Sequence, residues 1–449
     1  MKKFLPIFVL LIIATATILT GCKGTIPTPP SEAVVSGNGG LMATKGEYVY
    51  YVNGFESYNN IAETHSNKTG KVEISSINVA KNVGGELKEV QTLVSKVGGY
   101  EYSDLYVFGD KLYFLTPSTQ KDETGAVRGD IITLSSINLD GKKLKSIYTA
   151  EQYKSGKFAM IQVDGKLLAL VFDGSKIVKI DLSNDDEVTV LAENVTSAVL
   201  PTDKSCFDEH TQKYKDEASK FVYYTRSRNA QEGADEGVGG NIFEKVDVLT
   251  NQVSNISSNI NTTITVTNFV DDRVYYKKGD HYYSFKVDTP SVEARHTYIA
   301  VDGFYPLGED EQGNQLGVII SYSSKLYKQS LTDFVLPSNP VVSANATFVA
   351  SDKDQVVYLD ESNNLKMISV KDSKEVLIAP SEEKVTIMEG TKYDLDGRYL
   401  TFFASVDGYA SNYTYMVDIN QSTGSNPKAT LVGVVQESDI KTESESEEQ

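Results

Sequence analysis

The chain has 449 residues, enough for two or three ordinary domains or for one large repetitive domain. Its 61 Asp and Glu residues outnumber 43 Lys and Arg residues, and the formal charge of −18 disfavours nucleic acid and anionic lipid headgroups as partners. The 27 Tyr and 17 Phe residues, with frequent Val and Ile, favour strands, and no long stretch repeats its apolar residues at helical spacing. We therefore expect an all-β protein whose one short helix spans residues 208–220.

The first 22 residues have the pattern of a targeting segment. Lys2 and Lys3 precede an apolar run over residues 4–18, and this run is shorter than the roughly 20 residues that a transmembrane helix needs. A cleaved signal therefore fits the pattern better than a spanning helix. The next four residues, Leu-Thr-Gly-Cys at positions 19–22, resemble the lipobox of bacterial lipoproteins.

This resemblance implies that residues 1–21 are a signal peptide and that Cys22 becomes an acylated N-terminus. Each buried methylene contributes about 0.8 kcal/mol to membrane attachment, so two or more acyl chains anchor a protein firmly. We expect an extracytoplasmic protein anchored to the cell membrane or outer membrane, because Lys23 stands where an inner-membrane retention signal would have Asp. The other cysteine, Cys206, then has no disulfide partner, and we interpret it as structural.

The two ends of the mature chain are poor in core-forming residues. Residues 22–46 are rich in Pro and Gly and predict a flexible tether that follows the lipidated cysteine. Residues 436–449 are strongly acidic and predict a disordered, solubilising tail. The folded body is therefore expected over residues 47–435. Loss of Lys2 and Lys3 with the signal makes the formal charge −20.

A strand-turn-strand pattern recurs through this body about every 50 residues. Gly-Asp, Asp-Gly or Asp-Asp pairs precede several of the strands, as in tight hairpins. The aromatic or β-branched strand cores lie at residues 48–52, 111–115, 166–170, 221–224, 273–276, 317–320, 355–358 and 398–402. Four short strands in a unit of this length are typical of propeller blades.

The number of blades is either eight or seven. The sixth unit, residues 302–338, is short, and the first lacks a clear opening strand. Two or three separate β-sandwiches would show similar strand spacing. The run at residues 400–404 is apolar on both faces, which favours a single propeller because its sheets are covered on both sides.

Two segments resemble known propeller repeats. Residues 394–405 are similar to the Ser-Pro-Asp-Gly-Arg-Tyr-Leu-Ala-Phe repeat of TolB-like propellers, with Leu395 in place of Pro. Residues 109–115 are similar to the Gly-Asp-x-Leu-Tyr-Tyr units of YWTD-type and related bacterial propellers, although a chain without Trp lacks the YWTD signature itself. The resemblance implies a β-propeller and brings no catalytic residue with it.

The fourth unit carries a long acidic insertion over residues 201–241. Propeller loops gather on the faces of the ring, so this insertion is a candidate binding loop, and a solvated acidic loop is the alternative. Its acids are Asp208, Glu209, Asp216, Glu217, Glu232, Asp235 and Glu236.

Other site patterns are incomplete. The segment from Asp181 begins like a calcium loop but has Asp186 at the glycine position and Ala192 at the final ligand position. The four histidines show no zinc-ligand spacing, and the nucleophile elbow and phosphate loop are missing from the sequence. We therefore expect no metal, no cofactor and no catalytic residue that the sequence could name.

The sequence as a whole predicts a membrane-anchored, monomeric propeller that acts as a non-catalytic binding or assembly platform for a protein or glycan ligand. A carbohydrate-active or other hydrolytic propeller with paired carboxylates is one alternative, since the sequence neither names nor excludes such a pair. An extracellular sensory subunit is another. Fold alone does not choose among them.

Overall fold

A computed structural model gives the structure of the chain. Within the residues that it describes, every regular element is a β-strand, and no helix is long and apolar enough to cross a membrane. The described residues are 26–54, 74–83, 86–98, 104–117, 132–150, 157–201, 207–208, 213–214, 220–228, 240–257, 262–310, 312–378, 385–387, 393–396, 399–406, 412–419, 427 and 429–432.

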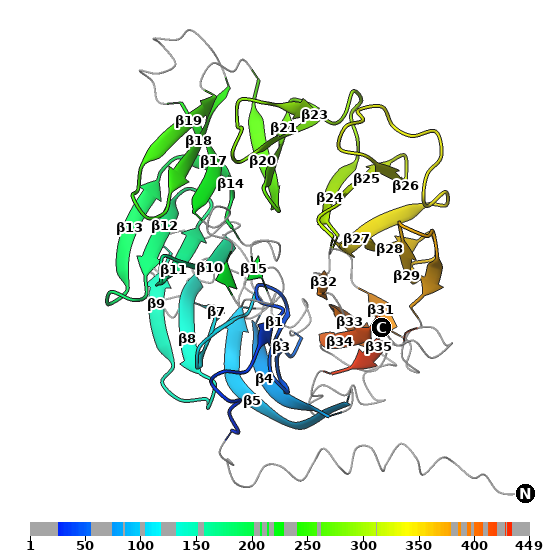
Figure 1. The fold of residues 1–449 in the computed structure, drawn as a ribbon. Helices are drawn as coiled ribbons and strands as arrows, with labels where there is room; N and C mark the ends of the chain where they lie inside the picture. Colours follow the sequence, from blue (N-terminus) through cyan, green and yellow to red (C-terminus); the bar gives the residue numbers. More distant parts are fainter. Residues whose placement is uncertain are drawn as a thin grey trace, which may run out of the picture.

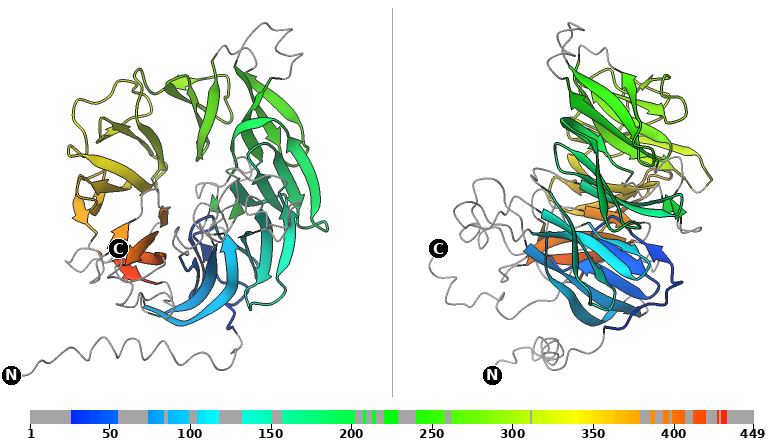
Figure 2. Two further views of the ribbon diagram at one scale, coloured as in Figure 1. Left: turned by 180° about the vertical axis from the view of Figure 1, so that it is seen from behind. Right: turned by 90° about the vertical axis from the view of Figure 1, so that its left-hand side faces the viewer.

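Apart from one two-stranded sheet within the fourth unit, the described strands form eight antiparallel sheets, blades 1 to 8, that follow one another around a ring (Figure 1). Figure 2 shows the ring from behind and from its side. Blade 1 contains β1 (Val35–Ser36), β2 (Met42–Lys45), β3 (Tyr48–Val52), β4 (Ile74–Val83) and β5 (Glu86–Gly98); blade 2 contains β6 (Tyr106–Phe108), β7 (Lys111–Pro117), β8 (Ile132–Asn138) and β9 (Lys145–Thr149). Blade 3 contains β10 (Lys157–Val163), β11 (Lys166–Phe172), β12 (Ile177–Asp181) and β13 (Glu187–Ala192); blade 4 contains β14 (Val195–Val199), β17 (Phe221–Ser227), β18 (Asn241–Asp247) and β19 (Val253–Ser257).

The second half of the ring repeats this order. Blade 5 contains β20 (Ile264–Val270), β21 (Arg273–Lys278), β22 (His281–Lys286) and β23 (Ala294–Arg295); blade 6 contains β24 (Gly303–Glu309), β25 (Gln315–Tyr322) and β26 (Lys325–Gln329). Blade 7 contains β27 (Ala346–Asp352), β28 (Gln355–Asp360), β29 (Leu365–Ser369) and β30 (Glu375–Leu377); blade 8 contains β31 (Val385–Ile387), β32 (Tyr393–Asp396), β33 (Tyr399–Val406), β34 (Asn412–Asp418) and β35 (Ala429–Leu431). The eight-bladed propeller expected from the sequence is confirmed.

Three blades depart from the four-stranded pattern in minor ways. In blade 1, β1 adds two residues beside β2. In blade 8, β31 and β32 pair with opposite halves of β33 and together occupy the position of one strand. Blade 6, which corresponds to the short sixth unit of the sequence, has three strands, and a single bridge from Leu326 to Val342 partly replaces the fourth.

The first two strands of most blades are joined by two-residue turns. Val163 pairs with Lys166 across Asp164 and Gly165, and both turn residues have positive φ, 49° and 75°. Such turns match the twist of the flanking strands, and Gly adopts positive φ without a steric cost. The same two-residue spacing joins Phe108 to Lys111 and Val270 to Arg273, as the Gly-Asp and Asp-Asp pairs predict.

Side chains of one strand pack against both neighbouring blades. In β7, Leu112 and Phe114 belong to a core cluster that they share with blade 1, and Tyr113 and Leu115 belong to a cluster that they share with blade 3. All four are at most 3% exposed. Alternation of side chains across a strand places successive residues on opposite faces. Each sheet is therefore covered on both faces, which separate sandwiches would not require.

The ring closes where blade 8 meets blade 1, at a surface that we call the seam. Within the described residues no strand is shared across the seam, because blade 1 takes its strands from the N-terminal part of the chain and blade 8 from the C-terminal part. Closure depends on side chains. Leu41 N donates to Asp394 Oδ2 at 3.1 Å, Asn82 Nδ2 donates to Tyr399 OH at 3.3 Å, and Met42 packs in one cluster with Met416.

Two sequence expectations are corrected. In place of a helix over residues 208–220, β15 (Phe207–Asp208) pairs with β16 (Lys213–Tyr214), consistent with the strand preference of the paired aromatic residues. The end of the expected tether is also folded: β1 and β2 lie within it, and Leu41 and Ala43 are fully buried. The sequence predicted a tether there because Pro and Gly are frequent in this segment. The few apolar residues among them nevertheless pack into blade 1. The predicted signal peptide and acidic tail lie outside the described residues.

Candidate functional site

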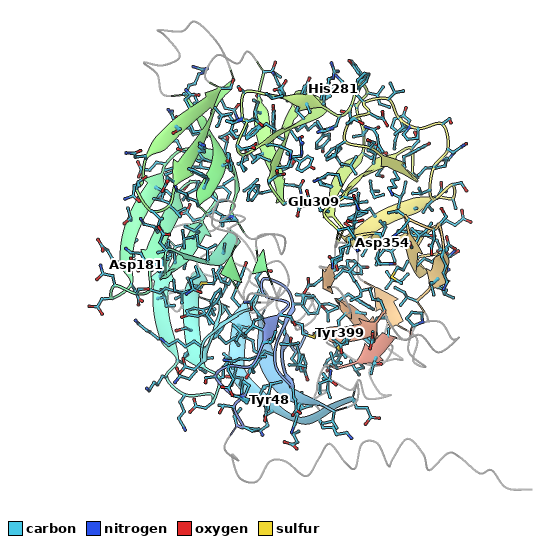
Figure 3. All side chains as sticks on the ribbon, in the orientation of Figure 1. Tyr48, Asp181, His281, Glu309, Asp354 and Tyr399 are labelled. Carbon is cyan, nitrogen blue, oxygen red and sulfur yellow. The ribbon has the colours of Figure 1, made fainter. Side chains whose placement is uncertain are left out.

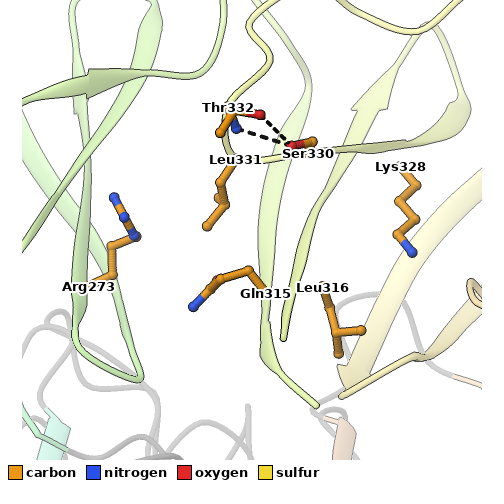
Figure 4. A pocket seen from close by; sticks show the side chains of 7 residues that line it. All are labelled: Arg273, Gln315, Leu316, Lys328, Ser330, Leu331 and Thr332. Atoms are coloured by element: carbon orange, nitrogen blue, oxygen red, sulfur yellow. Dashed lines mark hydrogen bonds between the residues drawn. The ribbon is translucent and has the colours of Figure 1, made fainter. Parts of the chain in front are cut away.

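A crevice of about 440 Å³ lies beside blade 6, at the ends of β25 and β26 (Figure 4). Arg273, at the start of β21, stands on one side, and Lys328, near the end of β26, stands on the other. The remaining lining residues are Gln315, Leu316, Ser330, Leu331 and Thr332. Leu331 and Thr332 belong to the loop that follows the shortened blade 6. The crevice therefore has apolar and hydroxyl-bearing walls and a cation on each side.

Buried polar side chains form a relay beside Arg273. Its Nη1 donates to Ser284 Oγ at 3.0 Å, and Ser284 Oγ lies 2.7 Å from His296 Nε2. Gln329 Nε2 donates to the backbone oxygens of His296 and Asp333, both at 2.8 Å. Ser284 and His296 are fully buried, and Gln329 is 2% exposed. The relay joins blade 5 to blade 6 through hydrogen bonds that buried polar groups require.

His296 is held neutral by its surroundings. Burial lowers its pKa, and the positive charge of Arg273 lowers it further, to about 4. The rings of Tyr275 and Phe304 lie 5.9 Å and 5.7 Å from the imidazole. A histidine with this pKa carries no charge at neutral pH and is poorly matched to proton transfer there. Its position favours a structural role over that of a catalytic base.

Arg273 and Gln329, two residues of the relay, keep unused hydrogen-bonding capacity. Arg273 Nε and Gln329 Oε1 are buried, and neither has a partner among the residues that the structure describes. Within the same part of the chain, Arg273 has no carboxylate partner, and Lys328 Nζ donates at 3.3 Å to the backbone oxygen of Val370 in blade 7. A bound polar group or ordered water would satisfy such atoms.

A second crevice, of about 570 Å³, lies between the outer strands of blades 3 and 4. It contains a paired charge: Arg226 Nε and Nη2 donate to the two carboxylate oxygens of Glu244 at 2.9 Å and 3.0 Å. Val190 and Val253 on its walls are each 49% exposed. The charges of Arg226 and Glu244 neutralise each other, and the exposed Glu193 is the remaining acidic residue of the lining.

Acids that the sequence left open as ligands are turn residues. Asp181 Oδ1 accepts from Ser183 N at 3.0 Å, and Asp360 Oδ1 accepts from Ser362 N and Asn364 N at 2.9 Å each. Figure 3 places Asp181, Glu309 and Asp354 at separate positions around the ring. No group of three or more potential metal ligands occurs among the described residues. The incomplete calcium loop at Asp181 is a turn, as its sequence indicates.

Most of the predicted site residues are not described. Of the seven acids named in the insertion, only Asp208 lies in the described part of the chain, in β15, and its backbone pairs with Lys213. Glu209, Asp216, Glu217, Glu232, Asp235, Glu236 and the lipidation site Cys22 lie outside the described residues. The binding loop and the lipid anchor remain predictions.

The crevice residues were missed by sequence reasoning. Arg273 marked a strand, and His296 was one of four histidines without ligand spacing. The relay draws on β21, β22, the segment after β23 and β26. Residues that converge from this many segments leave no contiguous motif.

Comparisons with known proteins find similarity only among solved structures. No protein-family model matches the chain, and no curated protein matches it. Solved structures do match: a prolyl endopeptidase (10% identity, TM-score 0.44), an oligogalacturonate lyase in complex with manganese (10%, 0.41) and Porphyromonas gingivalis dipeptidyl peptidase 4 (11%, 0.49). The matches cover 84%, 88% and 90% of this chain and 56%, 92% and 60% of those chains, respectively, so the chain spans little more than half of each peptidase. The likeness is one of fold alone.

Proposed function

We propose that this protein is a lipid-anchored, extracytoplasmic binding platform without chemistry of its own, and that the crevice beside blade 6 holds a polar group of its ligand. The observation that carries the proposal is the chemistry of the crevice. Its seven lining residues include no Asp, Glu, His or Cys, yet they include Arg273, which has no carboxylate partner among the described residues. The crevice therefore offers a cation that can bind a polar group, but its lining offers no carboxylate pair for hydrolysis.

The size and polarity of the crevice suit one group of a larger ligand. A volume of about 440 Å³ is at the lower end of small-molecule sites. Arg273 and Lys328 carry donors, the hydroxyls of Ser330 and Thr332 can donate or accept, and Leu316 and Leu331 supply apolar contact. A sugar or a polar side chain presents the matching acceptor and donor. Both glycan and protein ligands fit this description.

Ligand binding is tested by thermal shift with glucose, glucuronate, N-acetylglucosamine and N-acetylglutamate. We expect at least one probe to raise Tm, and the shift to disappear in Arg273→Met because the donor is lost. The matched control is Lys325→Met. This residue starts β26 and does not line the crevice, so the variant should keep the shift. The proposal fails if none of the probes shifts Tm, or if the purified protein releases products from oligosaccharides or peptides.

The anchor is tested separately by metabolic labelling with palmitate and detergent phase partition. We expect the wild-type chain to be labelled and to enter the detergent phase, because acyl chains on Cys22 would partition with detergent. Cys22→Ser should be unlabelled and remain in the aqueous phase. An unlabelled wild-type chain would contradict the anchor without affecting the crevice.

A further inference from the structure

Four large apolar side chains are exposed in two loops that meet where blade 5 adjoins blade 6. Tyr298 and Ile299, which follow β23, are 53% and 42% exposed, and Phe334 and Val335, which follow β26, are 45% and 68% exposed. The rings of Tyr298 and Phe334 meet edge to face, with centroids 4.9 Å apart. We call these four residues the aromatic shelf. Exposed apolar side chains that gather from separate segments are typical of interaction sites.

The loops that carry the shelf are fixed in place. Gln329 joins them, because its amide nitrogen donates to the backbone oxygens of His296 in one loop and Asp333 in the other. Thr297, 3% exposed, accepts from Tyr282 N through its hydroxyl at 3.0 Å and from Arg295 Nε through its backbone oxygen at 2.8 Å. A surface that is already ordered loses less conformational entropy when a partner binds.

A cation adjoins the shelf. The guanidinium of Arg295 lies 4.0 Å from the ring centroid of Tyr298 and 5.8 Å from that of Tyr283. Among the described residues it has no carboxylate partner, although the chain contains 61 acids and Arg226 is fully paired with Glu244. Arginine binds carboxylates through two parallel hydrogen bonds. Tyr and Arg are also the residue types most enriched among the strongest contacts of protein interfaces.

The charge and geometry of the shelf select one class of partner. A second copy of the chain and an anionic lipid surface are disfavoured by the net charge of −18. A sugar ring stacks on an open, flat aromatic face. Here Tyr298 has Arg295 over one face, and the planes of Tyr298 and Phe334 are inclined by 73°. Protein side chains can fill such an angled surface, and a single carboxylate complements Arg295.

We propose that the aromatic shelf docks a segment of a partner protein that presents one Asp or Glu to Arg295 and an adjacent apolar side chain to Tyr298 and Phe334. This inference rests on the proposed platform function and names its partner class. Long-range repulsion between the acidic chain and one carboxylate is screened within about 8 Å at physiological ionic strength, so the local cation determines the contact.

The test selects a random heptapeptide phage library on the full chain in detergent, and then measures the consensus peptide by fluorescence polarisation. We expect the consensus to place Asp or Glu beside Leu, Ile, Phe or Met. Arg295→Met and the double variant Tyr298→Ser/Phe334→Ser should each weaken binding at least tenfold. Replacing the peptide carboxylate by its amide should weaken binding to the wild type but add little in Arg295→Met, because the two changes remove the same contact.

The matched control is Val188→Ser/Val190→Ser, which removes another exposed apolar pair, 47% and 49% exposed, on β13. This variant should bind the peptide like the wild type. The inference is overturned if no peptide is enriched, if the consensus is basic, if the shelf variants bind normally, or if neutral oligosaccharides bind the shelf instead. Failure of the crevice would appear separately, because crevice binding is measured by the thermal shift with the four small-molecule probes, and shelf binding is measured with the peptide.

Discussion

Gly40 is the position where one methyl group should open the seam. A Cβ built there would lie 1.7 Å from Asp394 Oδ2 and 2.3 Å from Asp394 Cγ. The backbone of residue 40 cannot retreat easily, because its oxygen accepts from Leu105 N at 2.9 Å in a bridge to blade 2. Gly40→Ala must therefore displace the Asp394 carboxylate, which accepts a hydrogen bond from Leu41 N.

The cost follows from the groups that are displaced. A hydrogen bond from a buried backbone N–H to a carboxylate contributes about 1.5–3 kcal/mol, and Asp394 is 9% exposed. With some residual overlap, we expect Gly40→Ala to lower the free energy of unfolding by about 2–4 kcal/mol, measured by denaturant titration. Hydrogen exchange should increase most in blades 1 and 8, because the strands that the structure describes include none shared across the seam.

A double-mutant cycle separates this mechanism from general destabilisation. In an Asp394→Ala background the obstructing carboxylate is gone, so Gly40→Ala should cost much less than in the wild type. Gly109→Ala is the control, since no atom lies within 4 Å of the added Cβ and the expected cost comes from its φ of 57°. Additive costs for Gly40→Ala and Asp394→Ala, or exchange that increases equally in all blades, would refute the mechanism.

Three further predictions concern the relay, the ion pair and a turn. The pKa of His296 falls from 6.5 to about 4 on folding, so the unfolded state binds more protons between these pH values and stability should decrease by about 3 kcal/mol as pH falls from 6.5 to 4. Denaturant titration across this range should show a weaker pH dependence in His296→Gln but not in His281→Gln. Arg226→Met leaves Glu244, 6% exposed, without its bidentate partner. The free energy of unfolding should fall by about 3 kcal/mol, measured by thermal unfolding. The double variant Arg226→Met/Glu244→Met should recover most of this stability, because no unpaired charge remains buried. Gly165, at φ 75° with open space around it, should tolerate Asn better than Ala, with Ala costing about 1 kcal/mol; equal Tm values for the two variants would contradict a backbone origin.

The blades could be predicted from the sequence because turns and strand faces depend on neighbouring residues. Asp164 and Gly165 are adjacent in the chain, and a two-residue turn depends on the φ values of those two residues alone. In the same way, the alternation of Leu112 to Leu115 shows that both faces of β7 are apolar without reference to any other segment. The short sixth unit, which left seven blades as an alternative, corresponds to the three-stranded blade 6.

The seam and the crevice depend on ring closure, which local patterns do not encode. Asp394 and Leu41 are far apart in the chain, and nothing in either segment indicates that they meet. Arg273, His296 and Gln329 meet because blades 5 and 6 are neighbours at a particular register. A lone histidine gave no signal, because its importance comes from neighbours contributed by other strands.

The absence of a shared strand at the seam, within the described residues, has a mechanical consequence. If Cys22 is held in a membrane, a pull on the body enters through the N-terminal segment and reaches β1, which has only two residue pairs with β2. Further load passes to the contacts between blades 1 and 8, which are side-chain contacts that separate independently of a backbone ladder. Under tension the ring should therefore open at the seam while each blade stays folded. The N-terminal segment and the seam would carry the force in series.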